Sequence, residues 1–239
     1  LITVSSDATA RLWDARTGEP TGAPIRHEGM VFTACFSPDG ALVATGSADK
    51  TSRLWDGYDG SPLAGPLVHE DAVRSVSFSP EGQRLVTASH DHTARVWDTH
   101  GGNPLTEPMR HQGPVWSAEF SADGRQVLTA SSDRTVRLWD VRPGQTLAHA
   151  LPFKQAVHSV QWSPDGRRVL AFTLGQVRVW DANTGRPGAR RVGLEAGGRA
   201  FEVRHVGQLD DRLGLGQRGL GGADGVGNDR QGCQRVIQA

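Results

Sequence analysis

The chain has few of the residues that cross-link, anchor or strongly charge a protein. Its two cysteines, Cys35 and Cys233, are too few for a disulfide framework in 239 residues. The 26 basic and 26 acidic residues cancel, which argues against a nucleic-acid partner, because such partners usually require a basic face. No apolar run approaches the roughly 20 residues of a membrane span, and no signal peptide is evident. These absences favour a cytoplasmic protein without membrane insertion.

The most prominent feature of the chain is a repeated sequence motif. The dipeptide Trp-Asp begins at residues 13, 55, 97, 139 and 180, so successive copies are 42, 42, 42 and 41 residues apart. A fixed period of about this size indicates an array of one structural unit. Such arrays present extended surfaces, so binding is a more common function for them than catalysis.

Each unit also carries a turn sequence and two alternating segments. Phe-Ser-Pro-Asp-Gly or a close variant occupies residues 36–40, 78–82, 120–124 and 162–166. An apolar run such as 85–89 follows the turn, and an alternating segment such as 93–98 ends in Trp-Asp. Short alternating segments bounded by Pro, Gly and Asp predict strands separated by tight turns. A fourth, weaker strand is expected in the variable stretch, for example at 104–109.

These motifs, which recur in register, resemble the WD40 repeat family, whose units fold as four-stranded blades of a β-propeller. The resemblance covers roughly residues 1–188 and implies an all-β fold. It predicts a partial blade at 1–24, followed by blades at about 25–67, 68–109, 110–151 and 152–188. Since WD40 propellers usually close with about seven blades, we expect an incomplete propeller that is a piece of a longer protein.

The repeat pattern stops after residue 188. Residues 190–239 contain no Trp or Pro, have a single Phe (Phe201) and are dense in glycine. A segment of this kind buries little apolar surface to offset the entropy of ordering it. Three interpretations of 189–239 stand: a flexible linker, a degenerate blade, or an out-of-frame segment. One strand is expected at 200–206, at the edge of a blade.

Histidine, aspartate and hydroxyl residues recur at fixed places in three units. Each His lies 28 residues before the Trp of its Trp-Asp pair and each Asp six before it, with a Thr and a Ser just upstream of the Asp. A Ser, a His and an Asp in one unit resemble a hydrolase triad, but a structural role is favoured because catalytic sites are singular and this set is repeated. The WD40 resemblance instead implies a structural network from Asp to His, to Ser or Thr, to the Trp indole, with the hydroxyl partner of each pair left open. The network members are His27, Asp49 and Trp55; His69, Asp91 and Trp97; and His111, Asp133 and Trp139.

The fifth unit departs from this pattern. Phe153 replaces the His, and the segment 171–174 replaces the hydroxyl and Asp region with a turn that is one residue shorter. Replacing a whole polar set with apolar groups can be nearly neutral, whereas losing one member strands a buried polar group. We therefore expect a real, apolar-packed blade.

Two positions vary while the repeat frame holds. One lies between the His and the Phe-Ser-Pro-Asp-Gly motif, and the other follows the turn Asp. Both are expected at the same end of the propeller, and aromatic and Arg side chains are the usual anchors of protein interfaces. Drift at exposed positions is the alternative explanation for any one of them. The candidate partner-binding residues are Phe32, Arg74, Trp116 and His158 in the first position, and Lys50, His92 and Arg134 in the second.

We expect a non-catalytic scaffold that presents one propeller face to a protein or peptide, without cofactor or metal. The sequence 90–92, His-Asp-His, lacks a third metal ligand at sensible spacing. The spacers between units resemble those of bacterial WD40 arrays, often attached to serine/threonine kinases, so a sensing module of a larger signalling enzyme is the alternative. No kinase motif occurs in the 239 residues, and the oligomeric state is left open.

Overall fold

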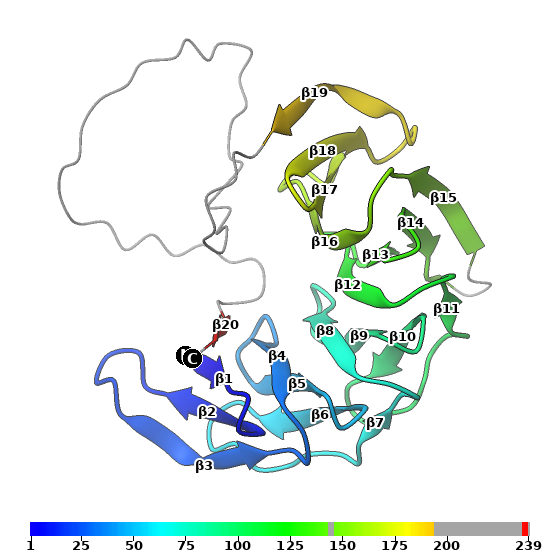
Figure 1. Ribbon diagram of the computed structural model, residues 1–239. Helices are drawn as coiled ribbons and strands as arrows, with labels where there is room; N and C mark the ends of the chain where they lie inside the picture. The colour runs from blue at the N-terminus through cyan, green and yellow to red at the C-terminus, as the bar shows by residue number, and fades with distance from the viewer. Residues whose placement is uncertain (143–145, 194–235, 239) are drawn as a thin grey trace, which may run out of the picture.

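The computed structural model describes residues 1–142, 146–193 and 236–238, and all regular structure in them is β-strand. Five four-stranded sheets follow one another around an arc (Figure 1). We number these sheets as blades 1 to 5 in chain order. The predicted all-β, propeller-type fold is therefore confirmed. Within those residues no helix is long and apolar enough to cross a membrane.

Blades 2, 3 and 4 repeat one pattern, in which three six-residue strands form an antiparallel meander and a fourth strand lies outside it. The first strand of each blade lies on the inner side of the arc (Figure 1). The strands are β4 (Val31–Phe36), β5 (Leu42–Ser47), β6 (Thr51–Asp56) and β7 (Leu67–Val68) in blade 2; β8 (Val73–Phe78), β9 (Arg84–Ser89), β10 (Thr93–Asp98) and β11 (Met109–Arg110) in blade 3; β12 (Val115–Phe120), β13 (Gln126–Ser131), β14 (Thr135–Asp140) and β15 (Thr146–Pro152) in blade 4.

Blades 1 and 5 stand at the two ends of the arc. Blade 5 forms with β16 (Val157–Trp162), β17 (Arg168–Thr173), β18 (Gln176–Asp181) and β19 (Pro187–Gly193), so its outer strand runs past residue 188. Blade 1 contains β1 (Ile2–Val4), β2 (Thr9–Trp13) and β3 (Pro20–Arg26). Its inner position is taken by β20 (Val236–Gln238), which pairs with β1 in parallel. Most of the segment 189–239, including the strand expected at 200–206, lies outside the described residues.

The fourth strand is weak in blades 2 and 3, as expected, and shorter than the predicted span. In blades 1, 4 and 5 the expectation of a weak fourth strand is wrong, since β3, β15 and β19 each have seven residues. In blade 3 the stretch 104–109 makes only an isolated bridge between Trp97 and Pro104 before β11 begins at Met109. Pro104 and Pro108 have no backbone N–H to donate, which explains why a continuous ladder does not form.

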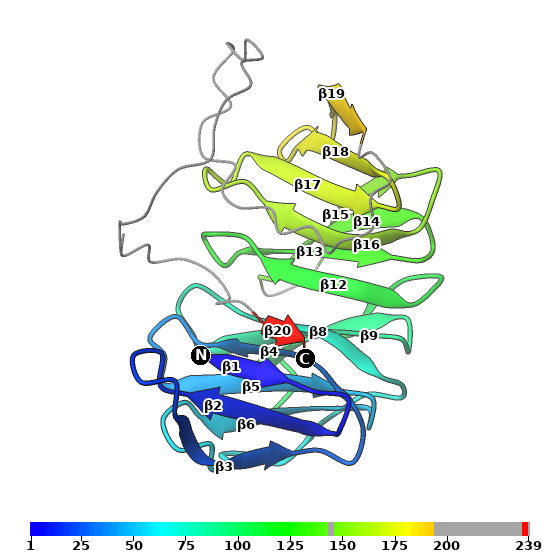
Figure 2. The ribbon, with the colours of Figure 1, turned by 60° about the vertical axis from the view of Figure 1, so that its left-hand side comes forward.

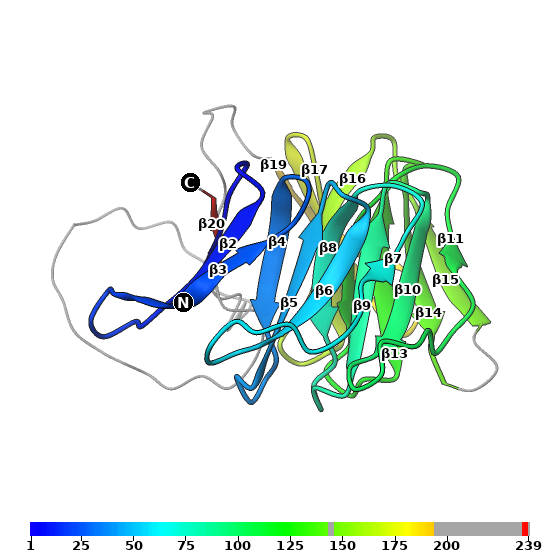
Figure 3. The ribbon, with the colours of Figure 1, turned by 90° about the horizontal axis from the view of Figure 1, so that it is seen from below.

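The hydrophobic core lies between the blades. Each of four buried clusters joins two successive sheets, which stack face to face along the arc (Figures 2 and 3). Alternation along each strand places apolar side chains on both faces of the central sheets, as this stacking requires. The Trp of each Trp-Asp pair from blade 2 onward packs against the preceding blade; for example, Trp180 shares a cluster with Leu128 and Leu138 of blade 4. Cys35 is buried in β4.

Candidate functional site

A buried polar network recurs in blades 2, 3 and 4. In blade 2, His27 Nδ1 lies 2.7 Å from Asp49 Oδ2, and His27 Nε2 lies 2.7 Å from Thr45 Oγ1. The indole N–H of Trp55 donates to the same hydroxyl at 2.9 Å. The same bonds, at 2.7–2.9 Å, link His69, Asp91, Thr87 and Trp97 in blade 3, and His111, Asp133, Thr129 and Trp139 in blade 4.

Geometry decides which hydroxyl of each pair belongs to the network. Thr45 bonds both the His and the Trp, whereas Ser47 Oγ donates to the carbonyl of Gly29 at 2.9 Å and accepts from the Asp49 N–H. The serine therefore fastens the β5–β6 hairpin to the loop before β4. Ser89 and Ser131 make the equivalent bonds in blades 3 and 4.

In blade 4 the network keeps the Asp133 carboxylate ionised and the His111 imidazole neutral near pH 7. Burial opposes ionisation of Asp133, but hydrogen bonds from Thr135, the Gln112 amide and His111 outweigh it and lower its pKa to about 2. Asp49 behaves in the same way, with a pKa of about 2. Burial lowers the pKa of His111 to about 4, although Asp133 opposes this shift. A satisfied buried network of this kind fixes one packing arrangement.

The network is not arranged for catalysis. The hydroxyls that would act as nucleophiles belong to Thr45, Thr87 and Thr129, whose side chains are 0% exposed and already bonded to both His and Trp. A substrate cannot approach them, and three copies of the same arrangement serve packing rather than chemistry.

Blade 5 lacks the network. Ala171 stands where Thr129 stands in blade 4, and Phe153 stands where His111 stands. The rings of Phe153 and Trp180 pack at a centroid distance of 5.5 Å. The Trp180 indole N–H, however, is buried and has no acceptor in the described part of the chain. The replacement is therefore apolar as expected, but it leaves one donor unsatisfied.

Blade 1 keeps part of the arrangement. Trp13 Nε1 donates to Thr3 Oγ1 at 2.9 Å, and Asp7 accepts hydrogen bonds from both the N–H and the hydroxyl of Thr9. The indole–threonine bond is thus common to the first four blades, and blade 5 alone has an alanine at that position.

A β-bulge explains the first variable position. In blade 2 the pairing of β4 with β5 passes from Val31 directly to Thr33, so Phe32 is left out of the ladder. A bulge re-aims the side chain of its extra residue and releases it from the in-and-out alternation of the strand. The other bulged residues are Arg74, Trp116 and His158.

The four bulged side chains contact one another across four blades. The Arg74 guanidinium lies over the Phe32 ring, 3.9 Å from its centroid, and 5.0 Å from the centroid of Trp116. Trp116 meets His158 edge to face at 5.4 Å. Burial lowers the pKa of Arg74, and its Nε has no hydrogen-bond partner among the described residues. We call Phe32, Arg74, Trp116 and His158 the bulge stack.

The second variable position is the left-handed residue of each β-hairpin. Lys50, His92 and Arg134 have φ angles of 71°, 71° and 66°, and their side chains are exposed. Residues with a Cβ are uncommon in this region. In blade 5 the same hairpin position is Gly175, with φ of 83°.

His90 and Ser132 support the bulge stack, although the sequence did not single them out for this role. The His90 ring meets Trp116 edge to face at 4.6 Å, and Ser132 Oγ accepts the Trp116 indole N–H at 2.6 Å. Burial and the nearby Arg74 charge lower the pKa of His90. Both residues directly precede the turn Asp, as Ala48 does in blade 2. The sequence signal that could have identified them is that this position, too, holds a different residue in each repeat.

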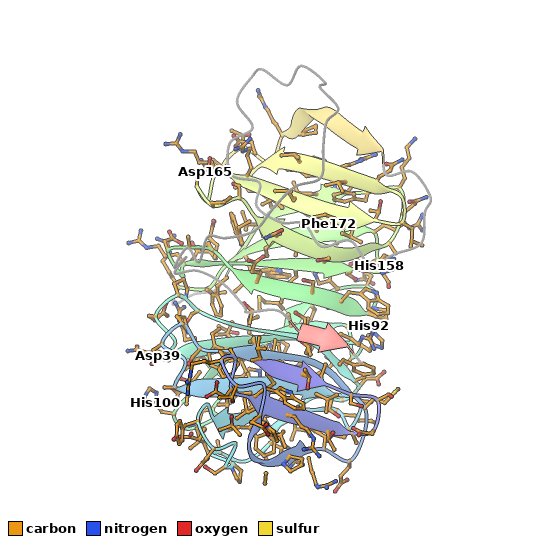
Figure 4. All side chains as sticks on the ribbon, turned by 90° about the vertical axis from the view of Figure 1, so that its left-hand side faces the viewer. Asp39, His92, His100, His158, Asp165 and Phe172 are labelled. Carbon is orange, nitrogen blue, oxygen red and sulfur yellow. The ribbon has the colours of Figure 1, made fainter. Side chains whose placement is uncertain are left out.

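Both variable positions lie at one end of the propeller. Backbone bonds such as Ala48 N–H to Met30 C=O (2.8 Å) tie each hairpin to the loop before the first strand. Figure 4 shows His92 and His158 at this end, while Asp39, His100 and Asp165 lie at the opposite one. We call these the top and bottom ends. At the bottom, Ser-Pro-Asp-Gly turns are closed by internal bonds such as Ser37 Oγ to Asp39 Oδ1.

No cluster of three or more metal-ligating side chains occurs in residues 1–142, 146–193 and 236–238. The adjacent residues 90–92 have three separate environments. His90 packs on Trp116, Asp91 accepts from His69 and Thr93, and His92 is exposed on the hairpin. The His-Asp-His sequence therefore does not bring its side chains together as ligands.

Comparison with solved structures shows a widespread fold. The chain is similar to the computationally designed protein Ika8, with a TM-score of 0.71 and 25% sequence identity over 80% of this chain and 57% of that one. The chain thus spans little more than half the length of that structure. In all, 1544 solved chains match, so the fold by itself does not select a function. A comparison with curated proteins finds no match.

The family model described as "WD domain, G-beta repeat" matches the chain four times, over residues 18–56, 61–98, 102–140 and 142–181. These matches cover more than half of the sequence and follow the same register as the Trp-Asp pairs. Repeats of this kind are generally protein-interaction modules. The resemblance seen in the sequence is confirmed, and the chain belongs to the WD40 repeat family.

Proposed function

We propose that this chain is a non-catalytic interaction module that binds a protein or peptide at its top end. The observation that carries the proposal is the bulge stack, in which Phe32, Arg74, Trp116 and His158 leave the regular ladders and form one half-buried surface across four blades. Aromatic and arginine side chains in partly desolvated positions are the usual anchors of binding energy. The buried network in blades 2 to 4 fixes one packing arrangement, and a surface that is already arranged before binding loses less entropy on binding.

The proposed partner is an acidic or aromatic peptide segment. The exposed cations Lys50 and Arg134 and the exposed imidazole of His92 lie on the hairpins at this end, and Arg74 is held between two aromatic rings. The neighbouring loops also carry acids, namely Glu28, Glu70 and Asp71. The face is therefore mixed in charge, which favours selective pairing over general attraction to polyanions.

A peptide-display selection tests this function. The chain would be immobilised and screened with a random peptide library, and the enriched peptides retested on the double variant Arg74→Ala/Trp116→Ala. We expect most enriched peptides to lose binding, because the double variant removes the centre of the bulge stack.

The matched control removes an aromatic and an arginine at the bottom end. Tyr58 is 82% exposed and Arg125 is exposed in the turn that follows β12. Tyr58→Ala/Arg125→Ala is expected to leave the enriched peptides bound. If the two double variants lose the same peptides, the partner site is not the bulge stack.

A further inference from the structure

Blade 5 contains a cavity where blades 2 to 4 contain the polar network. Its volume is about 130 Å³, enough for several waters or for a carboxylate group. The lining residues come from the loop before β16, the end of β17 and the start of β18. They are Phe153, Lys154, Gln155, Thr173, Gln176 and Arg178.

In blade 4 the equivalent position is occupied by the carboxylate of Asp133. Its Oδ2 accepts from the Gln112 N–H at 3.0 Å, lies 2.9 Å from His111 Nδ1 and accepts from Arg137 Nη2 at 3.4 Å. Its Oδ1 accepts from the N–H and hydroxyl of Thr135. Donors from the loop, the hairpin and β14 therefore converge on one side chain.

Blade 5 keeps donors at these places but has no acid. Strand register puts Arg178 where Arg137 lies, and the Lys154 amide follows Phe153 as the Gln112 amide follows His111. Gln176 takes the place of Thr135 at the start of the strand. Leu174, just before the left-handed residue of the hairpin, takes the place of Asp133 but is 78% exposed and does not line the cavity.

The charged side chains that line the cavity are both basic. Lys154 and Arg178 are its only ionisable lining residues, and the Arg178 guanidinium lies 5.5 Å from the centroid of the Phe153 ring. Arg137 has Asp133 as an ion-pair partner, whereas the described residues give Arg178 none. Planar guanidinium and amide donors around an acid-free cavity match the geometry of a carboxylate.

We propose that the blade 5 cavity binds a carboxylate from outside the chain, in the position that the Asp133 carboxylate occupies in blade 4. Arg178 and the Lys154 amide would donate to its oxygens, with Gln176 at the rim. The ligand class is a carboxylate on a short aliphatic stem, as in a free small acid, an Asp or Glu side chain, or a peptide C-terminus. The proposal shares no residue with the bulge stack and does not depend on it.

An acetate titration followed by ¹⁵N NMR on the full chain tests the proposal. Sodium acetate would replace sodium chloride at constant ionic strength, and the Lys154 and Gln155 amides and the Arg178 Nε–H would be monitored. We expect saturable shifts at these signals. Arg178→Gln should weaken the apparent affinity by about tenfold or more, and Lys154→Gln by less, because its backbone amide remains.

The matched control is Arg137→Gln in blade 4, which should leave the acetate titration unchanged. Arg74→Ala/Trp116→Ala should also leave it unchanged, which separates this site from the proposed function. Shifts that stay linear with acetate, or an apparent affinity that is unchanged in Arg178→Gln, would show that the cavity is not a carboxylate site. Peptides with a C-terminal acid, a C-terminal amide or an internal Glu then identify the source, since only those carrying the right carboxylate should compete with acetate.

Discussion

Blades 4 and 5 bury the same tryptophan in different ways. Trp139 and Trp180 are 8% and 6% exposed, and each packs against the preceding blade. The indole N–H of Trp139 donates to Thr129 within a network that ends at Asp133. The Trp180 N–H lies against an apolar environment, beside Phe153 and without an acceptor in the described residues.

The difference teaches that the network behaves as one unit. A buried His without its Asp, or an Asp without its His, would leave a polar or charged group unsatisfied, so the members of blade 5 differ together. The Trp is kept because its ring fills the space between blades, and this packing does not depend on the hydrogen bond. The network is thus part of the repeated packing of the blades, while the bulged residues vary from blade to blade.

The largest expected effect comes from breaking the blade 4 network at its acid. Asp133→Ala leaves His111 buried without its partner and should lower the free energy of unfolding by roughly 3–4 kcal/mol. The corresponding change in blade 5, Leu174→Ala, affects an exposed side chain and should alter it by less than about 0.5 kcal/mol. Urea unfolding of both variants measures the difference. Equal effects would mean that the two blades do not differ as described.

Lowering the pH should reduce the stability that the blade 4 network contributes, whereas blade 5 has no such network to lose. The His111 pKa of about 4 is below its ordinary value, so the unfolded state binds more protons between about pH 6.5 and pH 4. The stability from the neutral imidazole is therefore complete above pH 6.5 and decreases as the pH falls, by on the order of 2–3 kcal/mol. Protonation of Asp133, with a pKa of about 2, extends the loss at lower pH.

The His111 ring resonances followed against pH check this prediction directly. They should titrate near pH 4, and urea unfolding at pH 7.5 and pH 5 should show the decrease in stability. A His111 ring that titrates above pH 6.5 would reverse the sign of the expected effect.

Restoring one hydroxyl to blade 5 should stabilise it. Ala171→Thr offers an acceptor to the Trp180 N–H. Its own hydroxyl can donate to the Arg178 carbonyl because blade 5 has no network imidazole to take the proton; in blade 4 Thr129 Oγ1 lies 3.3 Å from the equivalent Arg137 carbonyl. We expect a gain of about 1 kcal/mol relative to Ala171→Val, which has the same shape without an acceptor. Thermal unfolding of the pair gives the measurement, and a valine variant as stable as the threonine variant would argue against an unsatisfied indole.

The hairpin residue gives the smallest expected effect. Arg134 adopts φ of 66°, where blade 5 has Gly175. Arg134→Gly should stabilise the chain by about 0.5 kcal/mol, since the relief of left-handed strain slightly exceeds the entropy that glycine adds to the unfolded state. The same variant should bind acidic peptides more weakly. A loss of stability would show that Arg134 contributes more to folding than its exposed side chain indicates.

Much of the fold could be predicted because Trp-Asp and Ser-Pro-Asp-Gly fix the strand register of each unit. The choice between Thr45 and Ser47 could not, because residues two apart on a strand face the same side and only the distances to Trp55 and His27 separate them. The bulges could not be predicted either, since Phe32, Arg74, Trp116 and His158 share no side-chain property that signals one.

The candidate site could be predicted as a set of variable positions but not as a contiguous stack. The contact of Arg74 with two rings depends on the angle between neighbouring blades, which the sequence of one repeat does not contain. The alanine at 171 shows in the sequence that the Trp180 N–H loses its usual threonine acceptor. Whether another acceptor replaces it depends on tertiary packing, which the sequence does not show.

The dissociation constant of a selected peptide tests the central claim most directly, that the bulge stack is the recognition surface. It would be measured by titration calorimetry on the unsubstituted chain, on Arg74→Ala/Trp116→Ala and on Tyr58→Ala/Arg125→Ala. We predict that the top-end variant binds at least about tenfold more weakly, a change of about 1.4 kcal/mol or more, while the bottom-end variant binds equally well. Unchanged affinity in the top-end variant, with both variants folded, would contradict the account.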